Sequence, residues 1–491
     1  MNHPSKVLRR LVALAAFAVI AFPVSVVSAD VVLYRVPGSS LTFLLMGNAT
    51  VNPGGTISLR HPRGMLYFGA QDCRIIRTSS KEKLYVAERS YAQKEGTADA
   101  YLELAKWCVE KGMLKQADQA LADAWRKDPN HERVALMVKL TQYRRGTVPM
   151  SPSVEAEMRD FVKQKDMKLA RSRHFVLLHD TPDVRDPKYG KSVAEHRLDL
   201  LEQVYDSFFM KYALEGYPLR VPREPMRVVL FNEHSDYLNF VNLLSPTLKM
   251  AAGFYSPKEN IAIFYRQKSD ESFEGAAQLS KLLADLRSSI KRNRVAGGGE
   301  IIRFAKTLEM LIDIDGENQE IEVVTHEATH QLAANSGLLD REKFQVRWAH
   351  EGLASYFESP KEATWAGLGA VNEQRLGYYR ILEQDPKHST IEFVVTDKIF
   401  DFAGSSYSVQ AAYGQAWALT HFLTERHLPE LMKFYKMMAV DDFESPRDEA
   451  WRKKTLETFR ECMGDLDALE TEWRRYMRSL KTDLEQIAAN M

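Results

Sequence analysis

Two histidines one helical turn apart constrain this chain more than any other feature of its sequence. His326 and His330 are the first and last residues of the segment His-Glu-Ala-Thr-His. This segment lies in a stretch from about 320 to 335 whose apolar residues recur at helical spacing. This apolar stripe consists of Ile321, Val324, Ala328 and Leu332. Residues four apart lie on one face of a helix, so both imidazoles can reach one metal ion at about 2.0–2.1 Å. The pattern predicts a helix with one face packed on its domain and another facing a metal.

Two glutamates complete the predicted metal site. Glu327 is set off from the two histidines, so its carboxylate can contact a water on the metal instead of the metal itself. Glu351 follows His330 after 20 intervening residues, on a second predicted helix whose small residues allow close approach to the first. We therefore expect Glu351 to be the third ligand, with His350 and Glu358 as alternatives. Two imidazoles and one carboxylate suit Zn²⁺ best.

Other types of zinc site do not fit the sequence. The elongated motif with a third histidine requires Gly at 333 and His at 336, and the chain has Ala333 and Ser336. Cys-based zinc spacing is absent because Cys73, Cys108 and Cys462 lie far apart. Cys108 falls in an amphipathic segment and is expected in a core. If the protein is exported, two of the three cysteines could form a disulfide.

The first 29 residues are typical of a secretory signal. Basic residues between 6 and 10 precede an apolar run from 11 to 27, and the small residues that end at Ala29 suit cleavage before Asp30. We expect an exported protein, periplasmic or extracellular, without a membrane span once the signal is removed. An uncleaved membrane anchor is the alternative, although the run is slightly short for a span and Pro23 interrupts it.

Length and charge narrow the possible functions. A chain of 491 residues, 45% of them hydrophobic, is long enough for two to four domains with sizeable cores. Lys and Arg number 66, as do Asp and Glu, so the formal net charge is zero. A nucleic-acid-binding protein needs a basic field to meet phosphates, and we expect no such partner.

Hydrophobic patterning predicts an α+β protein of several parts. Residues 30–92 contain short apolar runs broken by Gly, Pro and Asn, which favours a β-rich module such as a small barrel or sandwich. Residues 93–150 hold small and apolar residues at offsets that resemble one tetratricopeptide repeat. A lone repeat cannot bury its own face, so this helical hairpin is expected to dock on a neighbouring domain. A protein partner for the hairpin is the alternative.

The pattern becomes mixed α/β from 165 to 440 and helical from 441 to 491. Helical spacing is found from Val193 to Tyr212. A charged insertion, 267–318, is expected to be partly helical, with three glycines at 297–299 as a loose joint. The strand at 261–265 is either an edge that pairs with an extended peptide or an ordinary internal strand. Strands are predicted at 174–178, 226–231, 253–255 and 261–265.

The His-Glu-Ala-Thr-His motif at 326–330 and the segment around Glu351 resemble the motifs of the gluzincin metallopeptidases. These form the thermolysin-like and aminopeptidase-like clan called peptidase MA. In the aminopeptidase branch an Asn-Glu-Gly-Phe-Ala segment carries the third ligand, and this chain has His350-Glu351-Gly352-Leu353-Ala354. The resemblance spans about 170–480 and implies a zincin-like domain. It implies zinc ligands at His326, His330 and Glu351, with Glu327 as the general base.

The same branch has a tyrosine, some way beyond the third ligand, that steadies the oxyanion of the transition state. Tyr413 lies 62 residues after Glu351, at a similar distance, and Tyr407 is the alternative. The resemblance is closest to exported bacterial proteins of unassigned activity that join a repeat-like hairpin to such a domain. It implies a zinc metallopeptidase acting on a peptide or protein substrate.

Two other functions remain open from the sequence. The Gly-Ala-Met-Glu-Asn segment with which the aminopeptidases grip a free N-terminus is absent, so aminopeptidase specificity is not expected. A non-catalytic protein could keep the fold as a peptide-binding scaffold, although a binder would need neither Glu327 nor Tyr413. An envelope-associated adaptor could instead use the helical hairpin as its main element.

Overall fold

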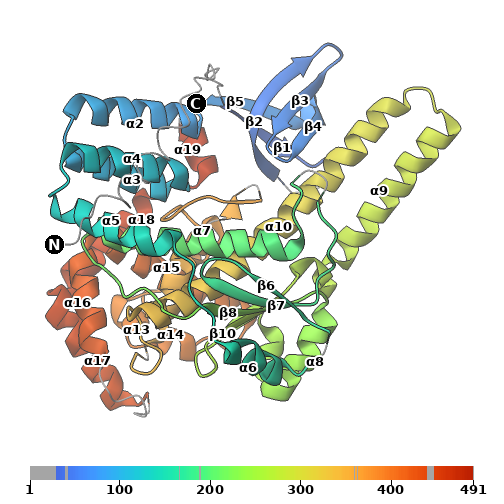
Figure 1. The fold of residues 1–491 in the computed structure, drawn as a ribbon. Coiled ribbons are helices and arrows are strands. Elements are labelled where there is room, and N and C mark those ends of the chain that lie inside the picture. Colours follow the sequence, from blue (N-terminus) through green and yellow to red (C-terminus); the bar gives the residue numbers. More distant parts are fainter. Residues whose placement is uncertain are drawn as a thin grey trace, which may run out of the picture. The chain divides into compact units, whose positions relative to one another are not determined.

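The structure, a computed structural model, describes residues 29–38, 42–164, 166–186, 189–344, 346–358, 360–361, 363–439 and 447–489. The chain is mixed α/β, with two five-stranded sheets, and the predicted α+β class is confirmed at that level (Figure 1). The predicted signal segment lies outside the described residues, apart from Ala29. Among the described residues, no helix is both long enough and apolar enough to cross a membrane.

The chain divides into two compact units. The first unit comprises Met1–Thr141, Ala213–Gly216 and Glu274–Asp315. The second unit comprises Gln142–Tyr212, Tyr217–Phe273 and Gly316–Met491. Each unit is therefore assembled from segments that are distant in the sequence.

The first unit begins with one antiparallel sheet in the order β4-β3-β2-β1-β5. Its two ends, β4 and β5, are not paired with each other in this order, so this pairing does not close a barrel. Strand β2 pairs with β1 through residues 42–47 and with β3 through residues 48–52. The strands end at Thr78 because Ser80 starts a helix, where its hydroxyl accepts a hydrogen bond from the Lys83 N–H. Residues 81–92 are thus helical and not part of the β-rich stretch. The strands are β1 Ala29–Arg35, β2 Thr42–Asn52, β3 Thr56–His61, β4 Gly64–Gly69 and β5 Cys73–Thr78, with a short 3-10 turn η1 at Ala70–Asp72.

Four helices follow the sheet where a single hairpin was expected. Ala105, Ala117 and Ala124 are fully buried and allow α3 and α4 to pack closely. Cys108 is buried in the same layer, as predicted, and all three cysteines are free, so the possible disulfide is not formed. The helices are α2 Lys81–Glu95, α3 Ala98–Glu110, α4 Leu114–Lys127 and α5 Glu132–Arg145.

The predicted insertion is a helical hairpin whose second helix continues into the His-Glu-Ala-Thr-His segment. Helix α9, Glu274–Asn293, ends in a turn where Gly297 adopts a φ of 73°. Helix α10 then runs from Gly298 to Ser336, over 39 residues. The helix expected from about 320 therefore begins 22 residues earlier. No proline interrupts 298–336, and Gly316 in its interior costs only about 1 kcal/mol relative to Ala, so the helix continues through it.

The second unit is built on a mixed sheet in the order β6-β7-β8-β10-β9. Strands β7, β8 and β10 are parallel, and β6 and β9 are antiparallel edge strands. Of the two alternatives for 261–265, the internal strand is correct, and β9 forms the edge instead. The strands are β6 Lys168–Arg171, β7 Phe175–His179, β8 Met226–Phe231, β9 Gly253–Ser256 and β10 Ile261–Tyr265.

Helices cover both faces of this sheet (Figure 1). On one face, α6 (Pro152–Val162) and α8 (His234–Leu244) pack against alternate strand residues in a buried cluster. On the other face lie α7 (Val193–Leu214), as predicted, and the C-terminal part of α10. Every described residue of β7 and β10 is buried, which explains their continuous apolar sequences.

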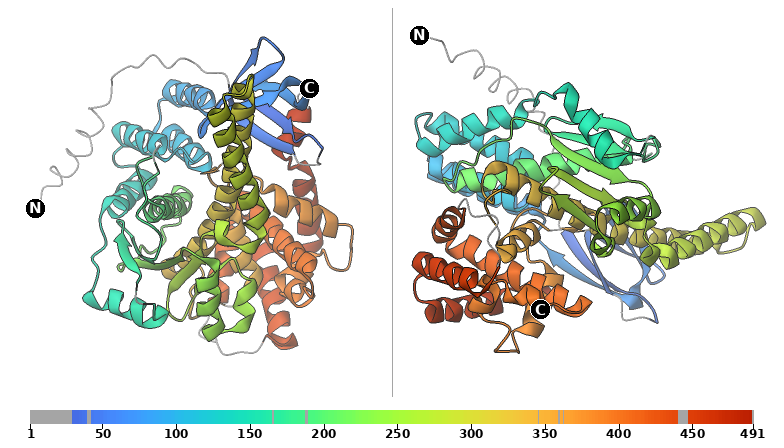
Figure 2. Two further views of the ribbon diagram at one scale, coloured as in Figure 1. Left: turned by 90° about the vertical axis from the view of Figure 1, so that its right-hand side faces the viewer. Right: turned by 90° about the horizontal axis from the view of Figure 1, so that it is seen from below.

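The rest of the second unit is mainly helical, and its C-terminal helices are drawn in orange and red in Figure 2. Helix α15 packs against both α11 and α12. The predicted apolar stripe of the last helices is buried at Phe459, Trp473 and Met477. The helices are α11 Arg347–Phe357, α12 Glu373–Leu382, α13 Ile391–Val395, α14 Lys398–Asp401, α15 Ser406–Arg426, α16 Leu428–Met438, α17 Glu449–Met463, α18 Leu466–Ser479 and α19 Asp483–Ala489. Short elements are η2 Pro246–Met250, η3 Gln267–Ser269, η4 Glu271–Phe273, β11 Pro360–Lys361 and β12 Thr364–Trp365.

Candidate metal centre

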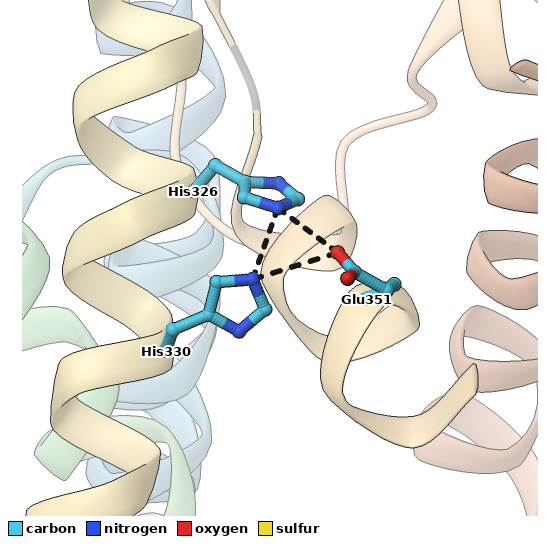
Figure 3. Close-up of side chains that lie close together, drawn as sticks. All are labelled: His326, His330 and Glu351. Atoms are coloured by element: carbon cyan, nitrogen blue, oxygen red, sulfur yellow. Dashed lines mark hydrogen bonds and ion pairs between the residues drawn. The ribbon is translucent and has the colours of Figure 1, made fainter. Parts of the chain in front are cut away.

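The three predicted ligands converge on one point between α10 and α11 (Figure 3). The Nε2 atoms of His326 and His330 lie 3.1 Å apart. Oε2 of Glu351 lies 3.3 Å from the first of these nitrogens and 3.5 Å from the second. Ligands at about 2.0–2.1 Å around a tetrahedral zinc ion would be separated by about 3.3 Å. The donor atoms and their spacing therefore fit a zinc ion.

A glycine allows the helix that carries Glu351 to come close to α15. A Cβ atom on Gly352 would lie only 2.5 Å from the carbonyl oxygen of Ala416 and would also collide with the Thr420 hydroxyl. No side chain fits there, which agrees with the close approach expected from the small residues after Glu351. Glycine is needed here for space, since its φ is not in the left-handed region.

A buried aspartate fixes the start of α11. The carboxylate of Asp397 accepts hydrogen bonds of 2.8 Å from the backbone N–H groups of both Arg347 and Trp348. These are orphan donors of the first helical turn. Burial raises the pKa of Asp397 to about 6, against the opposing effect of these hydrogen bonds and of nearby arginines. The helix is thus held at its first turn as well as along its side.

Glu358, one of the alternative ligands, instead orients His326 from behind. Its Oε1 lies 2.5 Å from Nδ1 of His326, on the side of the ring opposite to Nε2. Such a carboxylate fixes the ring and the tautomer that presents Nε2 to a metal. Glu358 is 1% exposed and is held in turn by Arg375, whose Nε and Nη2 atoms each lie 3.1 Å from its carboxylate. Asn372 donates a further hydrogen bond of 3.2 Å.

This chain of contacts keeps Glu358 ionised. Burial alone would raise the pKa of Glu358, but Arg375 and His326 together lower it to about 2. Glu322, one turn before His326 on α10, lies 3.6 Å from the same guanidinium. Burial and the negative charge of Glu358 raise the pKa of Glu322 to about 7. Arg375 therefore stabilises one carboxylate far more than the other.

Glu327 is buried beside the ligands, next to the edge strand. The backbone N–H of Tyr255 in β9 is near enough to its carboxylate to favour the ionised form. The pKa of Glu327 is raised, because burial outweighs the favourable charges of His326 and His330. A carboxylate with a raised pKa is suited to take up and release a proton near neutral pH.

Tyr413 reaches the site from α15. Its ring lies 6.1 Å from that of His326, and the guanidinium of Arg375 lies 5.2 Å from its centre. The charge of Glu351 and burial both raise the pKa of Tyr413, so its hydroxyl stays protonated and can donate a hydrogen bond. Tyr407, the alternative, is 51% exposed and packs against Tyr378. The structure thus brings Tyr413 to the ligands.

His350, the other alternative ligand, lies next to the site without joining the ligand set. Its Nε2 is 3.4 Å from the carbonyl oxygen of Phe344, and its ring is 6.3 Å from that of His330. Burial lowers the pKa of His350 to about 4, so it is neutral at pH 7. It can line the site as an uncharged side chain.

The sequence interpretation missed Arg375 and Asn372 and misjudged Glu358. Glu358 follows Glu351 by seven residues, which is two helical turns on the same face, so its place beside the ligands could have been inferred. Asn372 caps the N-terminus of α12 and Arg375 lies in the first turn of that helix, and no sequence spacing relates this helix to the ligands.

A comparison with known protein families adds one match. Residues 320–442 are similar to a family described as "Protein of unknown function (DUF1570)". The match covers about a quarter of the chain and contains all of the ligands as well as Glu327, Glu358, Arg375 and Tyr413. No curated protein and no solved structure matches the chain.

Proposed function

We propose that this protein is a zinc-dependent metallopeptidase. The observation that carries the proposal is the convergence of His326, His330 and Glu351 on one point, with Glu327 beside the two histidines on the same helix. A site built only to hold a structural metal needs no additional buried carboxylate with a raised pKa.

The residues divide into ligands and proton carriers. His326, His330 and Glu351 would hold Zn²⁺, which when bound acts as a Lewis acid and lowers the pKa of a water ligand to about 7. Glu327 takes the proton of the attacking water and passes it to the leaving amine. The Tyr413 hydroxyl donates a hydrogen bond to the oxyanion that develops on the scissile carbonyl.

The edge strand supports a peptide as the substrate. Gly253 brings β9 against α10, where a Cβ atom would lie 2.9 Å from a methyl carbon of Val323. Tyr255 of this strand then lies close to the Glu327 carboxylate. An extended peptide can add to a free sheet edge through main-chain hydrogen bonds, and this edge would place it next to the proton carrier.

The wider arrangement agrees with a zincin-like domain. A mixed sheet with an antiparallel edge strand lies against the helix that carries both histidines, and a later helix supplies the carboxylate. The close α3–α4 pair, with its buried alanines, supports one tetratricopeptide-like hairpin. Export through the N-terminal segment completes the proposal.

A peptide-library digest with wild-type protein and Glu327→Gln tests the function. We expect cleavage by the wild type, a loss of at least about 100-fold in the variant, and equal zinc content in both. Glu300→Gln is the matched control, since Glu300 lies at the start of the same helix and its side chain is 78% exposed. Zinc bound by both proteins without cleavage by either would contradict the proposal and identify a scaffold.

A further inference from the structure

The tip of the α9–α10 hairpin, residues 279–306, displays an unusual set of apolar side chains. Each of them is more than 40% exposed, and Leu282 reaches 66%. Leu283, Ile290 and Ala305, by contrast, are buried and hold the two helices together. The exposed residues are therefore additional to those that build the hairpin. They are Leu279, Leu282, Leu286, Val295, Ile301 and Phe304.

The hairpin tip is also strongly basic. Seven basic and two acidic residues give it a net charge of +5, in a chain whose formal net charge is zero. Lys291, Arg292 and Arg294 are exposed around the turn, and no ion pair to them is found within the described parts of the chain. Arg287, in contrast, pairs with Glu309 at 2.9 Å and belongs to the hairpin's own structure.

The hairpin tip is held in place by contacts across its turn and with strand β4. Gly298 lies against Ile290 across the turn, and the Thr307 hydroxyl accepts a hydrogen bond of 2.8 Å from the backbone of Tyr67 in β4. The guanidinium of Arg303 lies 5.5 Å from the ring of the same tyrosine. The exposed residues are thus presented by a hairpin that is anchored to the sheet of its own unit.

We propose that the hairpin tip binds an anionic lipid surface. Apolar side chains on a basic helical element enter the boundary between headgroups and acyl chains, while Lys and Arg meet the phosphates. A second copy of the chain is disfavoured as the occupant, since it would bring +5 against +5. A nucleic acid would use the charge but not the apolar residues. The inference does not depend on the proposed peptidase activity.

Vesicle co-sedimentation of the full chain tests the charges. Phosphatidylcholine vesicles with and without phosphatidylglycerol serve as anionic and neutral surfaces, and the neutral vesicles measure the binding that does not depend on lipid charge. Each basic residue near an anionic surface contributes about fivefold to affinity. Replacing Lys291, Arg292 and Arg294 together by Glu should therefore weaken binding to the anionic vesicles at least about 100-fold. Added salt should weaken binding by the wild type.

The matched control changes the net charge equally outside the hairpin. Lys94, Lys115 and Lys139 are exposed lysines of α2, α4 and α5, and their joint replacement by Glu should leave vesicle binding largely unchanged. For the apolar part, Leu282→Ser should weaken binding about tenfold. Val51→Ser, at a residue that is 65% exposed in β2, should have no effect. Circular dichroism and thermal unfolding verify that each variant is folded.

Three results would overturn the inference. The first is equal binding to anionic vesicles by the wild type and by the variant in which Lys291, Arg292 and Arg294 are replaced by Glu. The second is an equal loss in the Lys94, Lys115 and Lys139 control, which would show a general effect of net charge. The third is a fall in the oligomeric state of Leu282→Ser in analytical ultracentrifugation without a change in vesicle binding. That result would identify the tip as an interface between copies of the chain.

Discussion

The two ends of helix α10 use charged residues in opposite ways. At the C-terminal end, His326 and Glu327 are buried, and His326 is oriented by Glu358. At the N-terminal end, Glu300 and Arg303 are exposed and 3.9 Å apart. Burial with a fixed partner determines where a side chain points. An exposed charged residue has no such fixed orientation, so it acts mainly through its contribution to the net charge of the region.

This difference also sets the expected size of mutational effects. Breaking a buried ion pair leaves an uncompensated charge and costs about 3–5 kcal/mol. An exposed pair contributes about 0–1 kcal/mol. Single substitutions at the buried end should therefore change the chemistry of the site, whereas single substitutions at the exposed end should have small effects. Substitutions of three side chains around the C-terminal end of α10 test this contrast.

The largest effect is expected at Tyr413. Replacing it by Phe removes the donor to the oxyanion and should lower kcat about 100- to 1,000-fold, while zinc content and KM stay close to those of the wild type. Steady-state kinetics on a peptide that the protein cleaves would measure this. Tyr407→Phe is the matched control, because its exposed ring packs on Tyr378 instead. Equal losses of kcat in both variants would contradict the role of Tyr413 as the donor to the oxyanion.

A smaller effect is expected when His326 loses its carboxylate partner. Glu358→Gln should weaken zinc binding about 10- to 100-fold, because the imidazole is less firmly oriented and less basic. Competition with a chelator would measure the affinity. Glu322→Gln provides the control, since Glu322 also neighbours Arg375 but is not hydrogen-bonded to His326. If both variants bind zinc equally well, the contact between Glu358 and His326 has no part in metal binding.

The smallest effect concerns the pH dependence of stability. Because the pKa of Glu322 is raised to about 7, folded protein keeps a proton that the unfolded chain releases above its ordinary pKa of 4.5. Unfolding then releases a proton between these two values, so stability should fall as the pH rises through this window. The loss should be about 1–3 kcal/mol.

Urea unfolding of the metal-free protein below and above this window would measure the loss. Glu322→Gln cannot release the proton and should show a flatter dependence on pH, while Glu300→Gln should follow the wild type. A slope that is the same in all three proteins would show that Glu322 is not the group responsible.

Local patterns predicted the elements of the site well. The strand at 226–231 and the helix that begins at Val193 lie where apolar periodicity places them. His326, His330 and Glu351 were found because four-residue spacing defines a helix face and because small residues signal a close approach. The chemistry of these side chains is local information, and the sequence contains it.

Non-local arrangements were harder to predict. The order of β9 and β10 in the sheet depends on which neighbours each strand meets, and both segments are short and apolar. Glu358 directly follows α11 and Arg375 lies in α12, and because β11 and β12 separate the two helices, no single periodicity relates these residues. The extent of α10 was underestimated because the insertion was treated as separate from the motif, although no helix-breaking residue divides them.

The missing side chain at Gly352 has a consequence for which ions the proposed metal site would accept. With α11 resting directly on α15, the backbone beneath Glu351 has no room to retreat towards α15. A cation of larger ionic radius would have to be accommodated by rotation of the carboxylate alone, since the helix cannot step back to widen the cage. Selectivity among divalent ions would then depend partly on a residue that never touches the metal.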